Sequence, residues 1–396
     1  MSTIWLPGSD ALRPLPKGKT LAAYFTETFL PAATERRLSR DRIGELHQAV
    51  HRWNWWCSEE CQPKDRTDRP VLADMTPPRL TEFKKAALGA KLPGRDGKSR
   101  PVSPRSLNKT LQALEQILSA AVEDGTLDDT RSIMRIRKVE QPAQIGKLVL
   151  SDAQLGRIME AASAATWPHR TPGGKPIDAP EFWQAAIAMF ATYGMRTQDL
   201  TRYDRKMLPI RWGGVFPPGL SPADDGALES AHGWLCWVPN KTRNRKVFAM
   251  TLPLTECTAY WLTRWRSSCG KVADGDPLFE MPCAKDSFYE QWAKIVETAE
   301  VRPKPKVTFD ADGNIQKQQR QYKIKHLRCT AGTRADEHGA TLGYDSIGRW
   351  VTGHVSNDVF HRHYRSQEKP ILRTLESLPM PEDFVPTGTG LRVYAG

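Results

Sequence analysis

The sequence predicts a two-domain protein in which an all-α domain precedes an α+β, mainly helical domain with a small antiparallel sheet. Three observations predict this: the length of 396 residues, helical spacing of apolar residues in the first 125, and short Trp- and Val-bearing runs within 207–250. A chain of this length usually forms two or three domains. We expect a flexible arm over 1–19, the helical domain over 20–125 and a basic linker over 126–150. The second domain then spans 151–368, and a C-terminal tail spans 369–396.

The charge balance favours a polyanionic partner. Lys plus Arg number 57 and Asp plus Glu 45, giving a formal net charge of +12. Nucleic acid is the first candidate for such a chain, although a basic protein with no nucleic-acid role has the same balance. Seven scattered cysteines favour a reducing compartment over a disulfide framework. The sequence shows neither a secretory signal nor an apolar run of about 18 residues, so we expect a cytoplasmic protein without membrane contact.

Helical patterns fill residues 20–125. Ile43, Leu46 and Val50 recur at three- and four-residue steps, which lines one face of a helix. Ser103 directly precedes Pro104, the usual order of an N-cap and a first-turn proline. A close group of tryptophans is expected in the core or in a domain contact rather than stacked on bases: Trp53, Trp55 and Trp56.

The second domain begins with a capping box. Ser151 stands at the cap position and Gln154 follows three residues later. A strongly apolar helix is expected over 182–193, and the short runs of 207–250 are expected to be strands separated by turns. Residues 301–323 are polar and predict a loop. Three short helices should follow it, and then the tail, which holds one more short helical pattern.

Several basic boxes and a late tyrosine occur in order within the second domain. They are Arg196 with Asp199 three residues on, Lys241 in a basic turn, Lys325-His326-Leu327-Arg328, Gly353-His354, and Tyr364. This series resembles the tyrosine recombinases of the phage integrase family. That family has an arginine followed by an acid, a lysine in a β-hairpin, a His-x-x-Arg box, a His or Trp box, and a tyrosine. No single box is specific, but five in order over residues 150–370 are.

The resemblance implies a fold and an activity. The first domain would be a core-binding domain, a helical bundle of the SAM-like type, and the second the catalytic domain. The protein would be a site-specific integrase that integrates or excises a mobile element, cutting and rejoining DNA through a 3′-phosphotyrosine without cofactor, metal or ATP. Its partners would be double-stranded recombination sites, three further protomers in a tetramer, and accessory DNA-bending proteins. The tail would dock on a neighbouring protomer, and the nucleoid of a bacterial or phage-infected cytoplasm would be its location.

The resemblance also assigns the nucleophile and the phosphate clamp. Tyr364 would attack the phosphate, and the resulting 3′-phosphotyrosine would store the bond energy while a 5′-hydroxyl leaves. Tyrosine is a poor nucleophile at its own pKa and needs help from neighbouring groups. Arg196 and Arg328 would bind the non-bridging oxygens, because each guanidinium offers a planar fork of donors.

The remaining boxes would move protons and orient the arginines. Lys241 would protonate the leaving 5′-oxygen, and Lys246 on the same hairpin is the alternative donor. His354 would hydrogen-bond the phosphate or assist the tyrosine. Asp199 would orient an arginine without touching DNA.

Two features depart from the family pattern. Lys325 stands where the family usually has histidine, and His326 lies one step along the helix, about 100° round it. Tyr364 follows His354 by ten residues, where nine is more usual. His363 occupies the usual position but cannot replace a phenol in this chemistry.

Other interpretations stay open from the sequence. A type IB topoisomerase-like enzyme would use the same nucleophile, and a DNA-binding protein could keep the fold without cleavage. Each basic residue taken alone is also typical of a solvated surface. Metal binding is not expected, because the intervals match no known zinc finger in the one close group of ligand-type residues: His47, His51, Cys57 and Cys61.

Overall fold

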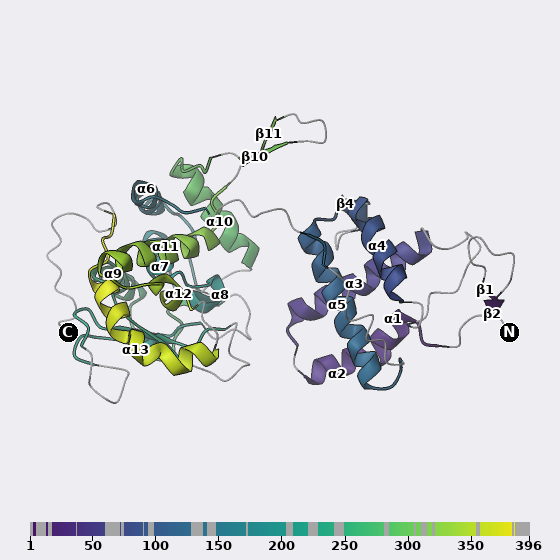
Figure 1. The fold of residues 1–396 in the computed structure, drawn as a ribbon. Coiled ribbons are helices and arrows are strands. Elements are labelled where there is room, and N and C mark those ends of the chain that lie inside the picture. Colours follow the sequence, from purple (N-terminus) through teal and green to yellow (C-terminus); the bar gives the residue numbers. More distant parts are fainter. Residues whose placement is uncertain are drawn as a thin grey trace. The chain divides into compact units, whose positions relative to one another are not determined.

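The chain divides into two compact units, Met1–Ile145 and Gly146–Gly396. Both are drawn in Figure 1. The computed structural model describes residues 3–4, 13–14, 18–36, 38–59, 72, 75–89, 91–93, 99–127, 138–140, 148–171, 173–202, 209–220, 229–240, 249–280, 285–304, 306–309, 315–318, 321–353, 357–381 and 384.

The first unit is built from helices. They are α1 (Leu21–Tyr24), a π-helical turn (Phe25–Phe29), α2 (Leu30–Glu35), α3 (Arg40–Glu59), α4 (Pro77–Gly89) and α5 (Pro104–Glu123). Two short antiparallel pairs accompany them, β1 (Thr3–Ile4) with β2 (Arg13–Pro14) and β3 (Lys91–Pro93) with β4 (Ser99–Pro101). The sequence predicts no strands here, because pairs of two or three residues are too short to leave an alternating pattern.

The core of the first unit takes buried side chains from α1, the π-helical turn, α2, α3, α4 and α5. The Oγ of Ser103 accepts the N–H of Ser106 at 3.2 Å, so α5 begins where the cap predicts. Trp53 and Trp56 are buried, and the ring of Trp53 lies 5.4 Å from that of Phe83. The prediction that these tryptophans form core is therefore confirmed.

Two of the four ligand-type residues in this unit, His47 and Cys57, serve packing. The ring of His47 meets the ring of Phe25 edge-on at 4.8 Å. Cys57 is fully buried in the apolar core. Cys61 lies outside the described residues.

The second unit is mainly helical with a small antiparallel sheet, as predicted. The sheet has the order β6 (Val215–Phe216), β7 (Trp234–Trp237), β8 (Met250–Pro253). A parallel pair joins β5 (Thr201–Arg202) to β9 (Phe279–Glu280). Its helices are α6 (Asp152–Ala162), α7 (Ala179–Tyr193), α8 (Thr197–Leu200), α9 (Glu256–Cys269), α10 (Lys285–Thr298), α11 (Lys325–Thr341), α12 (Ile347–Val351) and α13 (Asn357–Glu376).

One hairpin lies where the sequence predicts a loop. β10 (Lys306–Phe309) pairs antiparallel with β11 (Ile315–Gln318) inside the polar stretch 301–323. The sequence does not predict these strands because lysine is rare in strands. Strand formation also depends on packing context, which the sequence pattern does not show.

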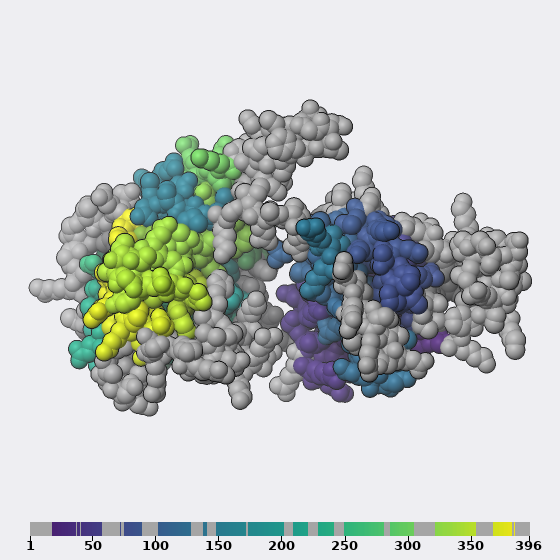
Figure 2. All heavy atoms as spheres, in the orientation of Figure 1, coloured from purple at the N-terminus to yellow at the C-terminus, as the bar shows by residue number. Residues whose placement is uncertain are grey.

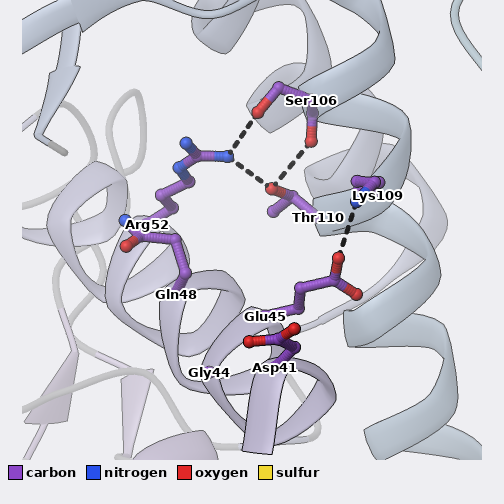
Figure 3. Close-up of a pocket in the computed structure, with 8 residues that line it drawn as sticks. All are labelled: Asp41, Gly44, Glu45, Gln48, Arg52, Ser106, Lys109 and Thr110. Atoms are coloured by element: carbon purple, nitrogen blue, oxygen red, sulfur yellow. Dashed lines mark hydrogen bonds and ion pairs between the residues drawn. The ribbon is translucent and has the colours of Figure 1, made fainter. Parts of the chain in front are cut away.

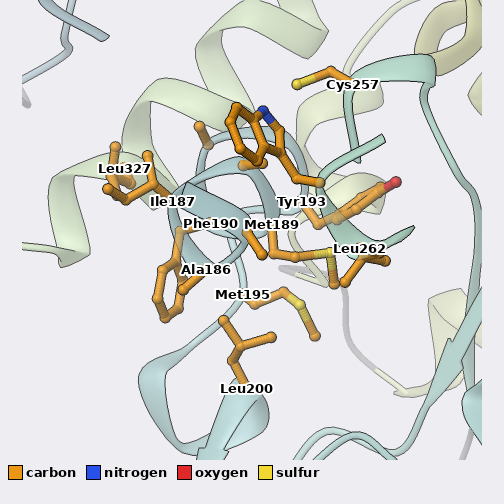
Figure 4. Close-up of a cluster of buried hydrophobic side chains, with 14 of the residues drawn as sticks. Ala186, Ile187, Met189, Phe190, Tyr193, Met195, Leu200, Cys257, Leu262 and Leu327 are labelled. Carbon is orange, nitrogen blue, oxygen red and sulfur yellow. The ribbon is translucent and has the colours of Figure 1, made fainter. Parts of the chain in front are cut away.

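Helix α7 is the centre of the second unit. Its residues are buried almost all round, as expected for a helix that is apolar on every face. It packs against α9 and α11, and the close-up shows Met189, Phe190 and Tyr193 within a cluster that includes Leu327 of α11 (Figure 4). The lime-green residues of α11 also reach one visible face of the unit (Figure 2). The end of α7 is therefore fixed from several sides.

Helix α13 runs past the predicted end of the second domain. The sequence predicts an end at residue 368 and a separate tail, whereas one helix continues through Pro370 to Glu376. Ile371 and Leu375 are buried in the core of the same unit, and the indole N–H of Trp261 donates to the carbonyl of Phe384 at 2.6 Å. Regular apolar spacing beyond the proline outweighs the break that proline usually causes.

The described part of the tail thus packs on its own unit. Docking in trans, predicted for the tail 369–396, stays a prediction. Among the helices of the described ranges, none is long and apolar enough to cross a membrane.

Gly194 ends α7 in the left-handed conformation, with φ 57° and ψ 34°. Its N–H donates to the carbonyl of Phe190 at 3.0 Å. A Cβ built at this position would lie 2.8 Å from the Cγ2 of Thr352 and 3.2 Å from the Cα of Arg328. Only glycine therefore satisfies both the backbone angle and the close approach of α11 and α12.

We expect Gly194→Ala to lower the free energy of unfolding by about 2–5 kcal/mol, because left-handed strain adds to overpacking. Gly343→Ala is the matched control: it has φ 80° and nothing within 4 Å of its Cβ position. Strain alone should cost the control about 1–2 kcal/mol. Urea denaturation measures both, and equal losses would contradict the close packing at Gly194.

Candidate active site

The first predicted arginine follows the end of α7. Arg196 is the N-cap residue of α8, and its side chain is 23% exposed. Its Nη1 lies 3.7 Å from the Oδ2 of Asp199. The acid three residues on therefore meets the arginine, and the guanidinium keeps a route to solvent.

Asp199 holds a second partner on the sheet side of the unit. Its carboxyl is only 2% exposed, and its Oδ1 accepts the backbone N–H of Asn240 at 2.8 Å. Burial raises the pKa of the Asp199 carboxyl, although the Asn240 N–H and the charge of Arg196 act in the opposite direction. Asp199 thus joins the turn after α7 to the residue that precedes Lys241.

The second predicted arginine lies on α11 and contacts two other elements. The Nη1 of Arg328 donates to the carbonyl of Gly194, and its Nη2 donates to the carbonyl of Thr352. Burial of the guanidinium, together with the nearby positive charge of Arg196, lowers the pKa of Arg328 to about 10. The structure therefore brings the two predicted arginines and Asp199 together at the ends of α7 and α12.

The histidine box begins at the end of α12. Gly353 has φ 61°, and a Cβ built there would lie 3.3 Å from the Sδ of Met250 in β8. Thr352 is buried, and its Oγ1 donates to the carbonyl of Gly348 at 2.6 Å. His354 follows directly in the sequence and lies outside the described residues.

The two candidates at the start of α11 differ in their surroundings. Lys325 is exposed and lies three residues before Arg328, so the two share one side of the helix. His326 lies two residues before Arg328, about 200° round the helix. Its Nδ1 accepts the N–H of Lys323 at 2.9 Å, and its ring lies 6.0 Å from that of Tyr322. His326 therefore closes the first turn of its own helix.

The remaining predicted residues are placed only in part. Lys241 and Lys246 lie outside the described residues. Tyr364 and His363 belong to α13, but their side chains lie outside the described part of the structure. The competing tyrosine is placed: the hydroxyl of Tyr344 accepts from Arg373 at 3.1 Å.

Sequence reasoning misses the backbone partners of the arginines. Asn240 and the carbonyls of Gly194 and Thr352 belong to none of the basic boxes. Asn240 had one signal, its position directly before Lys241. The carbonyls had none, because every residue has one and only the fold selects which is used.

The first unit contains a separate polar pocket of about 430 Å³ between α3 and α5 (Figure 3). The Nη1 of Arg52 donates there to Thr110 at 2.8 Å, and Lys109 pairs with Glu45 at 2.6 Å. Burial lowers the pKa of Arg52. Because one hydrogen bond and one ion pair join the two helices, we assign these contacts to helix packing.

Solved structures share this arrangement of elements. A lambda integrase (75–356) dimer bound to a COC′ core site has a TM-score of 0.52 at 12% identity, covering 86% of this chain and 93% of that chain. A lambda integrase dimer bound to a COC′ core site has a TM-score of 0.50 at 12% identity, covering 87% and 77%. The chain shares the fold of lambda integrase. That protein is a tyrosine recombinase, so the resemblance seen in the sequence is confirmed at the level of the fold.

A third structure, the XerH site-specific recombinase bound to its difH substrate, has a TM-score of 0.47 at 16% identity, covering 83% of this chain and 78% of that chain. No protein-family model and no curated protein sequence matches this chain.

We expect Arg328→Lys to lower the free energy of unfolding by about 1–3 kcal/mol, because one ammonium cannot serve two carbonyls that two separate nitrogens reach. Arg349→Lys is the matched control, since Arg349 is exposed and bonds Ser346 within its own helix. The control should stay within about 0.5 kcal/mol of the parent protein. Thermal unfolding followed by circular dichroism compares the two, and equal stabilities would contradict the joining role of Arg328.

Proposed function

We propose that the protein is a site-specific DNA recombinase that cuts and rejoins duplex DNA through a 3′-phosphotyrosine. The supporting observation is the pair Arg196 and Arg328, two cations held together at the junction of α7, α11 and α12. Burial and then the nearby charge of Arg196 lower the pKa of Arg328, and an anion bound between the two guanidinium groups would relieve their repulsion. The fold shared with lambda integrase supports the same activity.

The proposed reaction needs only groups of this chain. The Tyr364 oxygen attacks the phosphorus and passes its proton to His354 or to water. The bond from phosphorus to the 5′-oxygen breaks, and that oxygen takes a proton from Lys241 or Lys246. Charge rises on the non-bridging oxygens, where the two guanidinium forks bind them. Loss of one such donor typically costs about 10²–10³ in rate. The phosphotyrosine stores the bond energy, so the step consumes no ATP and uses no metal.

The other boxes assist this step. Lys325 shares the side of α11 that carries Arg328, so it would add a donor to the phosphate. His326 is the weaker candidate because its Nδ1 already accepts the Lys323 N–H. His354 would donate to the phosphate or assist the tyrosine, and His363 would bind nearby phosphate.

The first unit would act as the core-binding domain. It would hold duplex DNA together with the second unit, and four protomers would join two recombination sites. Accessory DNA-bending proteins would help to form this assembly, and integration or excision of a mobile element would be the outcome. The protein would work in the cytoplasm, on the nucleoid.

We expect a covalent protein–DNA adduct when the protein meets a pool of nicked duplexes with a randomised central sequence. The nick lets the short leaving strand diffuse away, so the adduct accumulates on a denaturing gel. Tyr364→Phe should abolish the adduct, because phenylalanine has no oxygen to attack phosphorus. Sequencing the trapped strands identifies the preferred site.

Tyr344→Phe is the control, since the Tyr344 hydroxyl is held by Arg373 and should not react. An adduct that survives Tyr364→Phe would overturn the assignment of the nucleophile. Binding to the pool without an adduct would favour the non-catalytic DNA-binding protein. Adducts without sequence preference, with relaxation of supercoiled plasmid, would favour the topoisomerase-like enzyme.

DNA affinity should fall steeply with salt, because lysines and arginines that bind phosphates release condensed counterions. For several phosphate contacts the expected loss is about 10³–10⁵-fold between 50 and 200 mM salt. Fluorescence anisotropy with a labelled duplex measures it. A flat salt profile would argue against phosphate binding by the basic surface.

A further inference from the structure

Asn240 makes two hydrogen bonds to the turn that carries the first arginine. Its backbone N–H donates to the Oδ1 of Asp199 at 2.8 Å, and its Nδ2 donates to the carbonyl of Gln198 at 2.6 Å. The residue follows β7 closely in the chain and is half-buried. The side chain and the backbone N–H of Asn240 therefore join the end of β7 to α8.

The two carboxyl oxygens of Asp199 have different partners. Its Oδ2 faces the Arg196 guanidinium at 3.7 Å, while its Oδ1 accepts the Asn240 N–H. A carboxylate this deeply buried is costly unless both oxygens find donors. The arginine and the end of the sheet thus depend on one group for their relative positions.

The sheet is fastened to the same region at a second point. The hydroxyl of Tyr193, the last residue of α7, donates to the carbonyl of Pro253 at the end of β8 at 3.1 Å. Strands β7 and β8 are therefore both tied to the segment that runs from Tyr193 to Asp199. Of these two connections, the one made by Asn240 directly precedes Lys241, the proposed proton donor.

We propose that Asn240 is a positioning residue that sets where Lys241 begins relative to Arg196. Consecutive Cα atoms are about 3.8 Å apart, so fixing the amide and side chain of Asn240 fixes the start of the next residue. A proton donor must reach the leaving oxygen while the arginines hold the same phosphate. The hydrogen bonds of Asn240 to Asp199 and Gln198 hold the residue before Lys241 in a fixed position relative to Arg196. The inference rests on the proposed function.

The test compares two scissile groups in the site trapped above. In one duplex the bridging 5′-atom is oxygen, which needs a proton to leave. In the other it is sulfur, whose thiol has a pKa of about 8.5 and leaves as thiolate without an acid. The ratio of the sulfur to the oxygen cleavage rate reports proton donation alone, because the active fraction and the DNA affinity cancel.

We expect Asn240→Ala to slow cleavage of the oxygen duplex by about 10²-fold and leave the sulfur duplex almost unchanged, because misplacing a catalytic group by about 1 Å has this effect. Asp199→Ala, which removes the other acceptor, should raise the ratio too. Asn108→Ala is the matched control: its side chain makes a similar pair of bonds to Val139, but in the first unit. Its ratio should equal that of the parent protein.

The outcomes separate the two proposals. An unchanged ratio in both Asn240→Ala and Asp199→Ala overturns the positioning role while leaving the recombinase proposal intact. Equal slowing of both duplexes also overturns it, since a structural role would act on both. Failure of the parent protein to form a covalent adduct with any duplex of the randomised pool counts against the proposed function itself.

Discussion

The guanidinium of Arg328 donates to the carbonyls that end α7 and α12, and the rest of the site depends on this junction. Three elements far apart in the sequence meet at one side chain: the turn of Gly194, the middle of α11 and the turn of Thr352. Residue 194 must be glycine for α12 to approach the end of α7 this closely, because the Cβ of any larger residue would collide with Thr352. The same arginine that would bind phosphate therefore also assembles the place where phosphate would bind.

The charges at this junction destabilise the fold, and packing elsewhere offsets that cost. Arg196 and Arg328 are partly buried and repel each other, and the buried Asp199 neutralises only part of their charge. Partly desolvated like charges stay close only when packing elsewhere holds their elements in place. The apolar helix α7 provides that packing, since its side chains fill the centre of the unit and its end carries the first arginine.

The sequence predicted what local patterns encode. Helix α5 begins at its cap, α7 ends at its glycine, and Arg196 and Arg328 come together as the order of boxes suggested. The hairpin of β10 and β11 was missed because its Lys and Gln residues carry little strand signal. The contacts of Asn240 and Thr352 were missed for another reason: they use backbone groups, whose partners are chosen by tertiary packing. His326 shows a third limit, since spacing gave its direction but not its bond to Lys323.

Pro370 has a consequence for the helix that carries Tyr364. Proline has no N–H, so the carbonyl of Ser366 lacks the bond that a residue at 370 would otherwise give it. The ladder of α13 is thus interrupted between the half that bears the tyrosine and the half anchored by Ile371 and Leu375. The second half keeps its buried contacts through Ile371 and Leu375, and one backbone hydrogen bond fewer joins the first half to it.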